Sequence, residues 1–304
     1  MDNTKQHILQ YTEQLYNAKF IKEYTIGNSG NLVFEVEKEA APFILRASVY
    51  SDAKQAHVNL ELNWVNYLTQ NLNNIVKPIK SLNNNLYEII GVDDKSYILC
   101  LFEKAKGKPV EINNPLDFND KLFFNMGVLM GSMHKLTSEY EGNACASTAP
   151  YSGLLSNLPQ SKDCYGIIHD DIHIHNFFVD NGQINLFDFD DCRLSWYAED
   201  IMSAFFYMVF FAQIWQKPKK HIIEFAESYL QVYFKGYAQA NNINRLCISK
   251  YNVFLRYRME GVYSYLTNMY KQSPLNPHKD FLFWLKHRLV NDLPLIDVDV
   301  MKFV

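Results

Sequence analysis

The chain has 304 residues, of which 48% are apolar and 15% aromatic, so it can bury one large hydrophobic core or two smaller ones. A formal net charge of -4 gives no basic excess of the kind that binds nucleic acid or anionic lipid, and a small-molecule partner is expected instead. The five cysteines are scattered without Cys-x-x-Cys spacing, which disfavours a disulfide framework or a structural zinc site and favours a reducing cytoplasm.

The first hundred residues predict a β-sheet accompanied by two helices. Helical periodicity covers residues 4–17 and 54–71, and the second of these places Val58, Leu62 and Val65 at helical spacing. Short β-rich runs separated by turn residues lie at 23–26, 32–36, 43–49, 86–90 and 97–102. Residues 1–15 are polar, so no signal peptide is expected.

The helical period dominates from residue 117 onward. Helices are expected at residues 117–136, 199–216, 219–240, 245–270 and 279–291. The most apolar stretch, residues 201–215, is shorter than the roughly 20 residues that span a bilayer, so we interpret it as a buried helix and expect no membrane contact. Short β-like pieces at 166–168, 177–179 and 184–187 interrupt the helices, and loops held in this way often carry chemistry.

Glycine and proline residues within 103–115 predict a hinge. The predicted fold class is therefore α+β, with a β-rich lobe up to residue 106 and a mainly helical lobe over residues 107–304. The sequence does not determine the oligomeric state.

One motif in the interrupting region carries a specific chemistry. Residues 169–176 read His-Asp-Asp-Ile-His-Ile-His-Asn and are followed by Asp-Phe-Asp-Asp at 188–191, which fits the kinase pattern H-x-D-x-x-x-x-N with a second acidic motif. Phosphoryl transfer requires an acceptor oxygen placed in line, a carboxylate that receives its proton, and metal ions that neutralise the phosphates. We therefore predict Asp171 as the catalytic base and Asn176 and Asp188 as ligands of Mg²⁺, which prefers oxygen donors.

With these motifs the sequence resembles the aminoglycoside phosphotransferase and choline kinase-like family, small-molecule kinases with a protein-kinase-like fold. The resemblance spans roughly residues 24–265 and is strongest over residues 167–201. It implies a two-lobed fold in which residues 1–106 clamp the nucleotide and residues 107–304 hold the catalytic groups and the acceptor. The implied reaction moves a phosphoryl group from ATP or GTP to a hydroxyl of a small molecule, such as an amino-alcohol, an amino-sugar or an aminoglycoside.

The family usually has glycine where Asp170 stands, so two carboxylates are adjacent here. We assign the base to Asp171 because it alone has the five-residue spacing to Asn176, and we expect Asp170→Gly to remain active. The resemblance also implies a set of nucleotide-binding residues: Gly27, Ser29, Gly30 and Asn31 of a phosphate-covering hairpin, Arg46 for the α- and β-phosphates, Glu61 as its partner, and Glu103 and Ala105 of an adenine-binding hinge.

Several interpretations of these residues stay open. The three histidines of residues 169–175 with Asp171 could be a zinc cluster, and Arg46 with Glu61 could be an ordinary surface ion pair. The aromatic residues 196–211 could form a cage for a quaternary amine, although core packing is favoured. A protein Ser/Thr kinase, or a nucleotide-binding module without transfer activity, would share the fold.

The sequence also contains a group of acidic residues near the predicted transfer point: Asp170, Asp190, Asp191, Glu199 and Asp200. Like charges that converge on one cleft concentrate cations, so this group predicts an acceptor that bears an amine.

Overall fold

The computed structural model describes residues 2–24, 30–142, 155, 157–272 and 278–304. The chain folds into two compact units. Unit 1 comprises Met1–Lys106, Glu141–Cys145 and Asn185–Asp190, and unit 2 comprises Gly107–Tyr140, Ala146–Ile184 and Asp191–Val304. The segment Asn185–Asp190, which the sequence predictions assigned to the helical lobe, is therefore part of unit 1.

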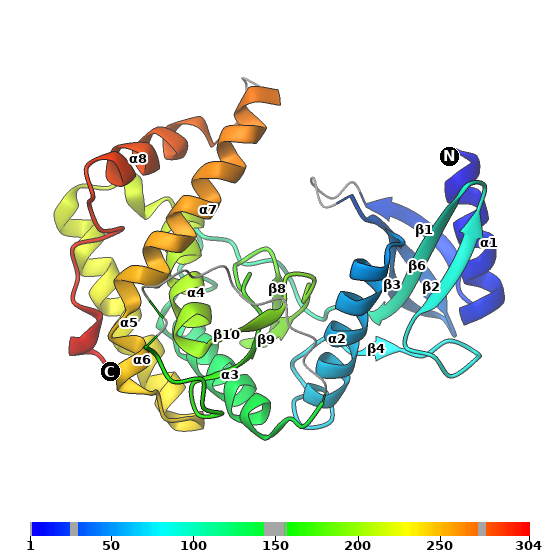
Figure 1. Ribbon diagram of the computed structural model, residues 1–304, viewed down its shortest axis with the longest axis horizontal. Coiled ribbons are helices and arrows are strands. Elements are labelled where there is room, and N and C mark those ends of the chain that lie inside the picture. The colour runs from blue at the N-terminus through cyan, green and yellow to red at the C-terminus, as the bar shows by residue number, and fades with distance from the viewer. Residues whose placement is uncertain (1, 25–29, 143–154, 156, 273–277) are drawn as a thin grey trace. The chain divides into compact units, whose positions relative to one another are not determined.

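Unit 1 is built on an antiparallel sheet with helices beside it (Figure 1). Its elements in chain order are α1 (Asn3–Tyr16), β1 (Lys19–Tyr24), β2 (Leu32–Lys38), β3 (Ala41–Val49), α2 (Asp52–Leu68), β4 (Pro78–Ile79), β5 (Glu88–Val92) and β6 (Lys95–Glu103). The strand order is β1-β2-β3-β6-β4, and β5 pairs with β6 on the same edge as β4.

The two faces of this sheet bury different side chains because neighbouring residues of a strand point to opposite sides. Along β6, Leu99 and Leu101 pack in one core cluster with Ile8 of α1, whereas Ile98 and Cys100 pack in a second cluster that includes residues of α2. Helix α1 therefore covers one face and α2 the other.

Both helices begin at a side chain that caps free backbone N–H groups. Asp2 accepts a hydrogen bond from the N–H of Lys5 at 2.9 Å, and Ser51 accepts one from the N–H of Lys54 at 3.1 Å. Helix α1 ends where Asn17 takes a left-handed conformation, with φ of 53°.

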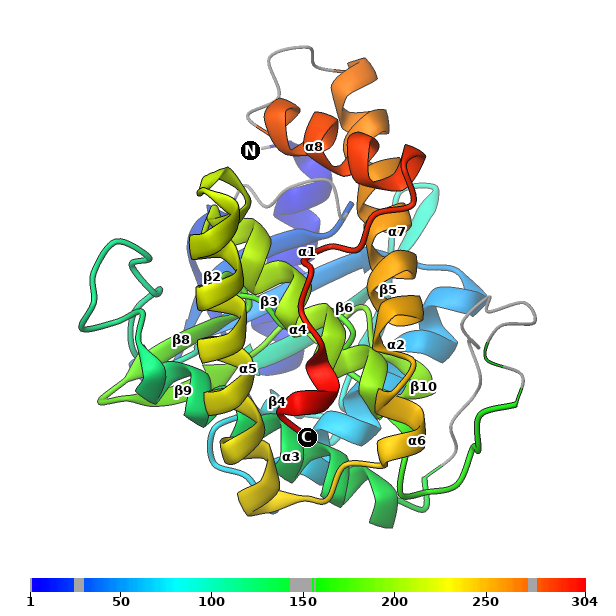
Figure 2. The same cartoon turned by 90° about the vertical axis from the view of Figure 1, so that its left-hand side faces the viewer.

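Unit 2 is mainly helical, with short strands between its first two long helices. Its elements are α3 (Asp120–Glu139), β7 (Tyr165–Ile168), β8 (Phe177–Asp180), β9 (Gln183–Leu186, whose end enters unit 1), β10 (Arg193–Trp196), α4 (Tyr197–Phe211), η1 (Ile214–Gln216), α5 (Lys219–Ala240), α6 (Arg245–Ile248), α7 (Tyr251–Gln272), α8 (Lys279–Val290) and η2 (Val300–Lys302). The strands form the pairs β7–β10 and β8–β9. After α8 the chain returns toward α6, where Arg245 donates to the carbonyl of Val304 (Figure 2).

Helices α3 and α5 pack closely because glycines stand at their contacts. A Cβ at Gly127 would lie 2.0 Å from the carbonyl oxygen of Tyr233, and one at Gly236 would lie 2.1 Å from that of Phe124. No side chain fits at such distances, so these glycines permit the close approach of the two backbones.

Most predicted elements occur, with shifted ends. The helix predicted over 245–270 is instead two helices, α6 and α7, which are separated at Ser249 and Lys250. Strand β10 was missed because its run of four residues, Arg-Leu-Ser-Trp, is too short to distinguish a strand from a loop even though polar and apolar side chains alternate in it. Its pairing with β7 defines it as a strand.

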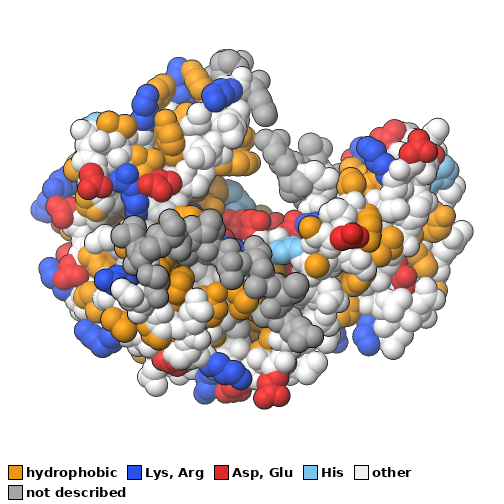
Figure 3. Space-filling view, viewed as in Figure 1, with side chains coloured by type: hydrophobic (Ala, Val, Ile, Leu, Met, Phe, Trp, Pro, Cys, Tyr) orange, Lys and Arg blue, Asp and Glu red, His pale blue; other side chains and the backbone are white. Residues whose placement is uncertain are grey.

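Helix α4 is buried nearly all round, as expected for the apolar stretch that it contains. Of the helices in the described residues, none is long and apolar enough to cross a membrane. On the face drawn in Figure 3, basic and acidic side chains are interspersed over both units.

Candidate functional site

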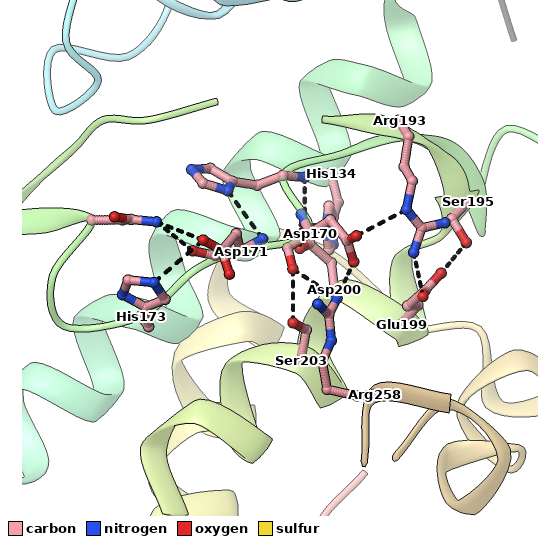
Figure 4. Close-up of polar contacts among 12 residues, drawn as sticks. His134, Asp170, Asp171, His173, Arg193, Ser195, Glu199, Asp200, Ser203 and Arg258 are labelled. Atoms are coloured by element: carbon pink, nitrogen blue, oxygen red, sulfur yellow. Dashed lines mark hydrogen bonds and ion pairs between the residues drawn. The ribbon is translucent and has the colours of Figure 1, made fainter. Parts of the chain in front are cut away.

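The loop between β7 and β8 is held by helix α4. The backbone N–H groups of His169 and Asp170 both donate to the carboxylate of Asp200, at 3.0 and 2.9 Å (Figure 4). Asp200 is fully buried in the first turn of α4, and it also contacts the ring of His134 at 3.2 Å. Burial alone would raise the pKa of Asp200, but His134 and the loop N–H groups outweigh it and lower the pKa below its ordinary value. An ionised carboxylate therefore anchors the loop.

Asp171 is the partly exposed acid of this loop. Asn176 Nδ2 donates to its carboxylate at 3.0 Å and to its backbone carbonyl at 2.9 Å, and His173 Nε2 lies 3.3 Å from the carboxylate. The hydroxyl of Tyr207 on α4 adds a further hydrogen bond. Burial would raise the pKa of Asp171, but the contacts with His173 and Tyr207 prevail and hold it well below its usual range. Asp171 is thus ionised at neutral pH and can receive a proton.

Asp170 has a different environment from its neighbour. Its backbone is left-handed, with φ of 69°, which explains why glycine suits this position. Its side chain is buried and forms ion pairs with Arg193 Nε, at 2.9 Å, and with Arg258 NH2 (Figure 4). Burial raises the pKa of Asp170, although the two arginines oppose this rise. A carboxylate held by two guanidinium groups is poorly placed to act as a base.

In unit 1, Arg46 and Glu61 form a buried pair. The guanidinium donates to both carboxylate oxygens, at 2.9 and 2.5 Å, and the two residues are 7% and 1% exposed. The interpretation as an ordinary surface ion pair is therefore wrong. Burial lowers the pKa of Arg46, but Glu61 outweighs it and keeps the guanidinium charged.

Asp190 collects further polar contacts of unit 1. Its carboxylate lies 2.6 Å from Lys54 Nζ and 3.5 Å from Arg46 NH1, and it accepts from Asn31 Nδ2 at 3.0 Å. Burial would raise the pKa of Asp190, but Arg46 and Lys54 lower it to about 2. The ring of His57 contacts the backbone carbonyl of Asp190 at 2.6 Å. Two cations therefore face this carboxylate, of which the sequence predicted only Arg46.

The remaining predicted residues belong to the acidic motif, Asp188, and to the hairpin, Gly27, Ser29 and Gly30. Asp188 is exposed two residues after the end of β9 and has a φ of 63°. The next residue, Phe189, packs on Trp64 with ring centroids 5.5 Å apart. Gly30 has a left-handed φ of 72°. Gly27 and Ser29 lie outside the described residues.

The predicted hinge residues lie at the end of β6, whose last residue is Glu103. The N–H of Glu103 donates to the carbonyl of Lys77 at 2.9 Å, so this amide belongs to the sheet edge. Between Glu103 and Ala105, the Nζ of Lys104 lies 2.9 Å from the buried carboxylate of Glu35 on β2. Glu35 also accepts from the hydroxyl of Tyr24 at 2.5 Å. The end of β1 and the predicted hinge are thus held by one carboxylate.

The acidic group predicted from sequence is not a set of free negative charges. Glu199 is bound by Arg193 at 2.5 Å and by Ser195, and Asp170 and Asp200 are held as described above. Asp190 belongs to unit 1, where it is paired with Lys54. The premise that these carboxylates are free to concentrate cations is therefore wrong, because a sequence shows how many charges a segment has but not their partners. The preference for an amine-bearing acceptor stays a prediction.

A zinc cluster and an aromatic cage were the two further interpretations of the loop and of α4. Within the described ranges, no three His, Cys, Asp or Glu side chains are grouped so that they could hold a metal ion. Of the aromatic residues considered for a cage, Phe205 and Phe206 are fully buried and belong to the core. Tyr207 and Phe211 are partly buried, with ring centroids 5.0 and 4.8 Å from that of His173.

Sequence reasoning missed several residues of these contacts: Lys54 and His57 in unit 1, and Arg193, Tyr207 and Arg258 in unit 2. Arg258 lies 88 residues after Asp170, and no local pattern marks it. Asp190 stood within the recognised acidic motif, so its position could have suggested a cationic partner.

The fold and the site can be compared with known proteins. The phosphotransferase enzyme family matches residues 151–242, which include the loop of Asp171 and the start of α4. The amicoumacin kinase of Bacillus subtilis (strain 168) is 26% identical in an alignment 308 residues long, which covers 92% of this chain and 90% of that protein. The family resemblance predicted from the sequence is confirmed.

Solved structures show the same fold over nearly the whole chain. Amicoumacin kinase hAmiN, in complex with AMP-PNP, Ca²⁺ and Ami, has a TM-score of 0.84 at 24% identity, covering 99% of this chain and 97% of that one. The microcompartment-associated aminopropanol kinase has a TM-score of 0.61 at 18% identity, covering 84% and 86% of the two chains. The predicted α+β kinase-like fold and the prediction of a small-molecule kinase with a hydroxyl acceptor are confirmed.

Proposed function

We propose that this phosphotransferase uses ATP and Mg²⁺ to phosphorylate a hydroxyl of amicoumacin or of a related amine-bearing small molecule. The observation that carries the proposal is the ionised carboxylate of Asp171, which Asn176 and His173 hold at 3.0 and 3.3 Å. The coverage of the amicoumacin kinase relative, 92% of this chain and 90% of that protein, supports the choice of acceptor.

In the proposed reaction the acceptor oxygen bonds to the γ-phosphorus while the bond from that phosphorus to the departing ADP breaks. Asp171 receives the proton of the acceptor hydroxyl. Arg46 and Lys54 are the cations of unit 1 that would stabilise the phosphate charges, and they already lie around one carboxylate, Asp190. The proposed base and the two proposed cations thus each have a defined chemical environment.

Asn176 and Asp188 are the proposed metal ligands. Both supply oxygen donors, which Mg²⁺ prefers, and Asn176 uses its Nδ2 for two bonds to Asp171, so its Oδ1 points away from that residue. Magnesium at these residues would neutralise phosphate charge. The Ca²⁺ and AMP-PNP bound by the hAmiN structure support a divalent cation and an adenine nucleotide as the cofactors.

Glu103 and Ala105 are proposed to pair with the nucleotide base. The N–H and C=O of one strand residue point to the same side of the strand. The N–H of Glu103 donates to Lys77, so the carbonyl of Glu103 points to that side of β6 as well. The phosphates are proposed to be covered by the hairpin residues Gly27, Ser29, Gly30 and Asn31. GTP is the alternative to ATP as the phosphoryl donor.

A coupled assay for ADP release tests the proposal. Amicoumacin, 1-amino-2-propanol and their N-acetylated analogues are offered with MgATP or MgGTP at low salt, where charge effects are least screened. We expect acceptor-dependent ADP release with amicoumacin and a phosphorylated product in the mass spectrum. Faster phosphorylation of a Ser/Thr peptide library would indicate a protein kinase instead. If N-acetylated analogues match their parents in kcat/KM, the acceptor site does not select amines.

A further inference from the structure

Arg258 connects helix α7 to the backbone of the Asp171 loop. Its NH2 donates to the backbone carbonyl of Asp170 at 2.8 Å and also to the Asp170 carboxylate (Figure 4). The Oγ of Ser203 on α4 donates to the same carbonyl at 2.8 Å. A residue that stands 88 positions later in the chain therefore holds the peptide bond that leads into Asp171.

Both sides of Asp170 are fixed in this way. Its N–H donates to Asp200, its carbonyl accepts from Arg258 and Ser203, and its φ of 69° is one that residues with a side chain seldom adopt. Such a conformation persists only where surrounding contacts impose it. The direction in which the chain leaves Asp170 then determines where the carboxylate of Asp171 points.

A second set of contacts leads from Arg258 to the same carboxylate. The guanidinium carbon lies 5.6 Å from the ring centroid of Tyr207, whose hydroxyl hydrogen-bonds Asp171. Arg258 thus contacts both the residue before Asp171 in the chain and a side chain that bonds Asp171 directly.

The cost of this arrangement indicates that it does more than stabilise the fold. Four charged side chains, those of Asp170, Arg193, Glu199 and Arg258, are each at most 14% exposed. In the described part of the chain, Arg193 NH1 and Arg258 Nε are buried without a hydrogen-bond partner. Buried ion networks are often no more stabilising than apolar residues of similar size, because the charges lose their hydration.

We propose that Arg258 is a positioning residue for Asp171, so that helix α7 sets the geometry of the catalytic base through the backbone of Asp170 and the ring of Tyr207. This inference rests on the proposed function of Asp171. It also argues against the sequence-based expectation that Asp170→Gly remains active. Glycine relieves the strain of the left-handed backbone, but it leaves the buried guanidinium of Arg258 with only a backbone carbonyl as its partner.

The experiment compares four variants with wild type: Arg258→Met, Arg258→Lys, Asp170→Asn, and the double variant Asp170→Gly/Arg258→Met. Arg256→Met is the matched control, since Arg256 stands on the same helix but is partly exposed and pairs with Glu260 and Asp292. Steady-state kinetics are measured on folded protein, with thermal unfolding in parallel.

We expect Arg258→Met to lower kcat by roughly tenfold to a hundredfold, as a small displacement of a catalytic group does, with KM for ATP within about twofold. Arg258→Lys should give an intermediate kcat, because an ammonium keeps the charge but lacks the planar fork of donors. The double variant should be no slower than Arg258→Met, since the two side chains act as one unit. If folded Arg258→Met has the kcat of wild type, Arg258 stabilises the fold but does not position Asp171. This conclusion holds even if the Tm of the variant is lower.

Amide hydrogen exchange tests the inference independently of activity. The N–H groups of residues 169–171 should exchange at least tenfold faster in Arg258→Met than in wild type, and not in Arg256→Met. If Arg258→Met does not fold, Arg258→Lys and Asp170→Asn serve in its place. Unchanged amide exchange in Arg258→Met would overturn the inference, even if the protein transfers phosphate. If wild type has no transfer activity, the proposed function is overturned, and the exchange result still decides the role of Arg258.

Discussion

Arg46 donates to both carboxylate oxygens of Glu61, at 2.9 and 2.5 Å, in the interior of unit 1. Both partners are charged, and neither can reach water readily. Breaking such a pair from one side leaves a buried charge without compensation, whereas replacing both partners removes the desolvation cost together with the attraction.

Glu61→Ala is therefore expected to lower the free energy of unfolding by about 3 to 5 kcal/mol. The double variant Arg46→Met/Glu61→Met should be less destabilised than Glu61→Ala, yet should raise KM for ATP about tenfold or more because a phosphate-binding cation is lost. Urea denaturation and steady-state kinetics measure the two effects. Lys219→Met, which breaks an exposed pair with Asp297, is the control and should change stability by less than about 1 kcal/mol. An equal KM in the double variant would contradict a role of Arg46 in nucleotide binding.

Asp171→Asn is expected to lower kcat by roughly 10²-fold to 10⁴-fold, because the acceptor for the proton is lost. Binding of MgATP, measured by calorimetry, should change little, since the nucleotide contacts proposed for unit 1 remain. Asp297→Asn, on the exposed surface, is the control for the change of charge. Activity within threefold of wild type would rule out Asp171 as the base, and Asp170 could not replace it while two arginines hold its carboxylate.

Asp188→Ala and Asn176→Ala are both expected to weaken binding of MgATP, and Asp188→Ala more strongly because a full negative charge is lost. Calorimetric titration of MgATP into each variant makes the comparison. EDTA should abolish transfer, and added Mg²⁺ should restore it. Restoration by Zn²⁺ but not by Mg²⁺ would point back to the histidines of the loop as metal ligands.

Glu35 gives a prediction for stability against pH. Its pKa is lowered to about 2, first by the hydrogen bond from Tyr24 and then by Lys104. Because the folded-state pKa lies below the value of about 4.3 for an unfolded glutamate, the stabilisation is present above that pH and is lost as the pH falls toward 2. Between pH 5 and pH 2.5, wild type should therefore lose more stability than Glu35→Gln.

The matched control for this prediction is Glu37→Gln, which changes an exposed residue on the same strand. Denaturant titrations at several pH values give the slopes. Parallel slopes for wild type and Glu35→Gln would show that the contacts of Glu35 with Tyr24 and Lys104 contribute no pH-dependent stability.

The sequence predicted those features that depend on local spacing. Asp171 and Asn176 lie five residues apart in one loop, and a loop that returns into a strand brings them within 3.0 Å of each other. The buried face of α2 was predicted from the helical spacing of Val58 and Leu62, and these residues lie in one core cluster with Ile98 and Cys100 of β6.

Features that depend on distant partners could not be predicted. Asp170 gives no sign of whether it faces solvent or two arginines, because Arg258 comes from a helix 88 residues later. The same limit explains the mistaken acidic group and the missed strand β10, which exists through its pairing with β7. Periodicity reports which face of an element is buried, but not what lies against it.

Residues 185–190 belong to unit 1 but are synthesised long after Lys106, and this affects how unit 1 folds during synthesis. The N–H of Leu186 donates to the carbonyl of Asn74, the N–H of Val76 donates to the carbonyl of Leu186, both at 2.9 Å, and Phe189 packs on Trp64. About 80 residues separate Lys106 from this segment, and ribosomes add roughly 5–20 residues per second. Unit 1 therefore stays incomplete for several seconds on the ribosome, and during that time the nascent chain is expected to rely on chaperones until Asp190 has emerged.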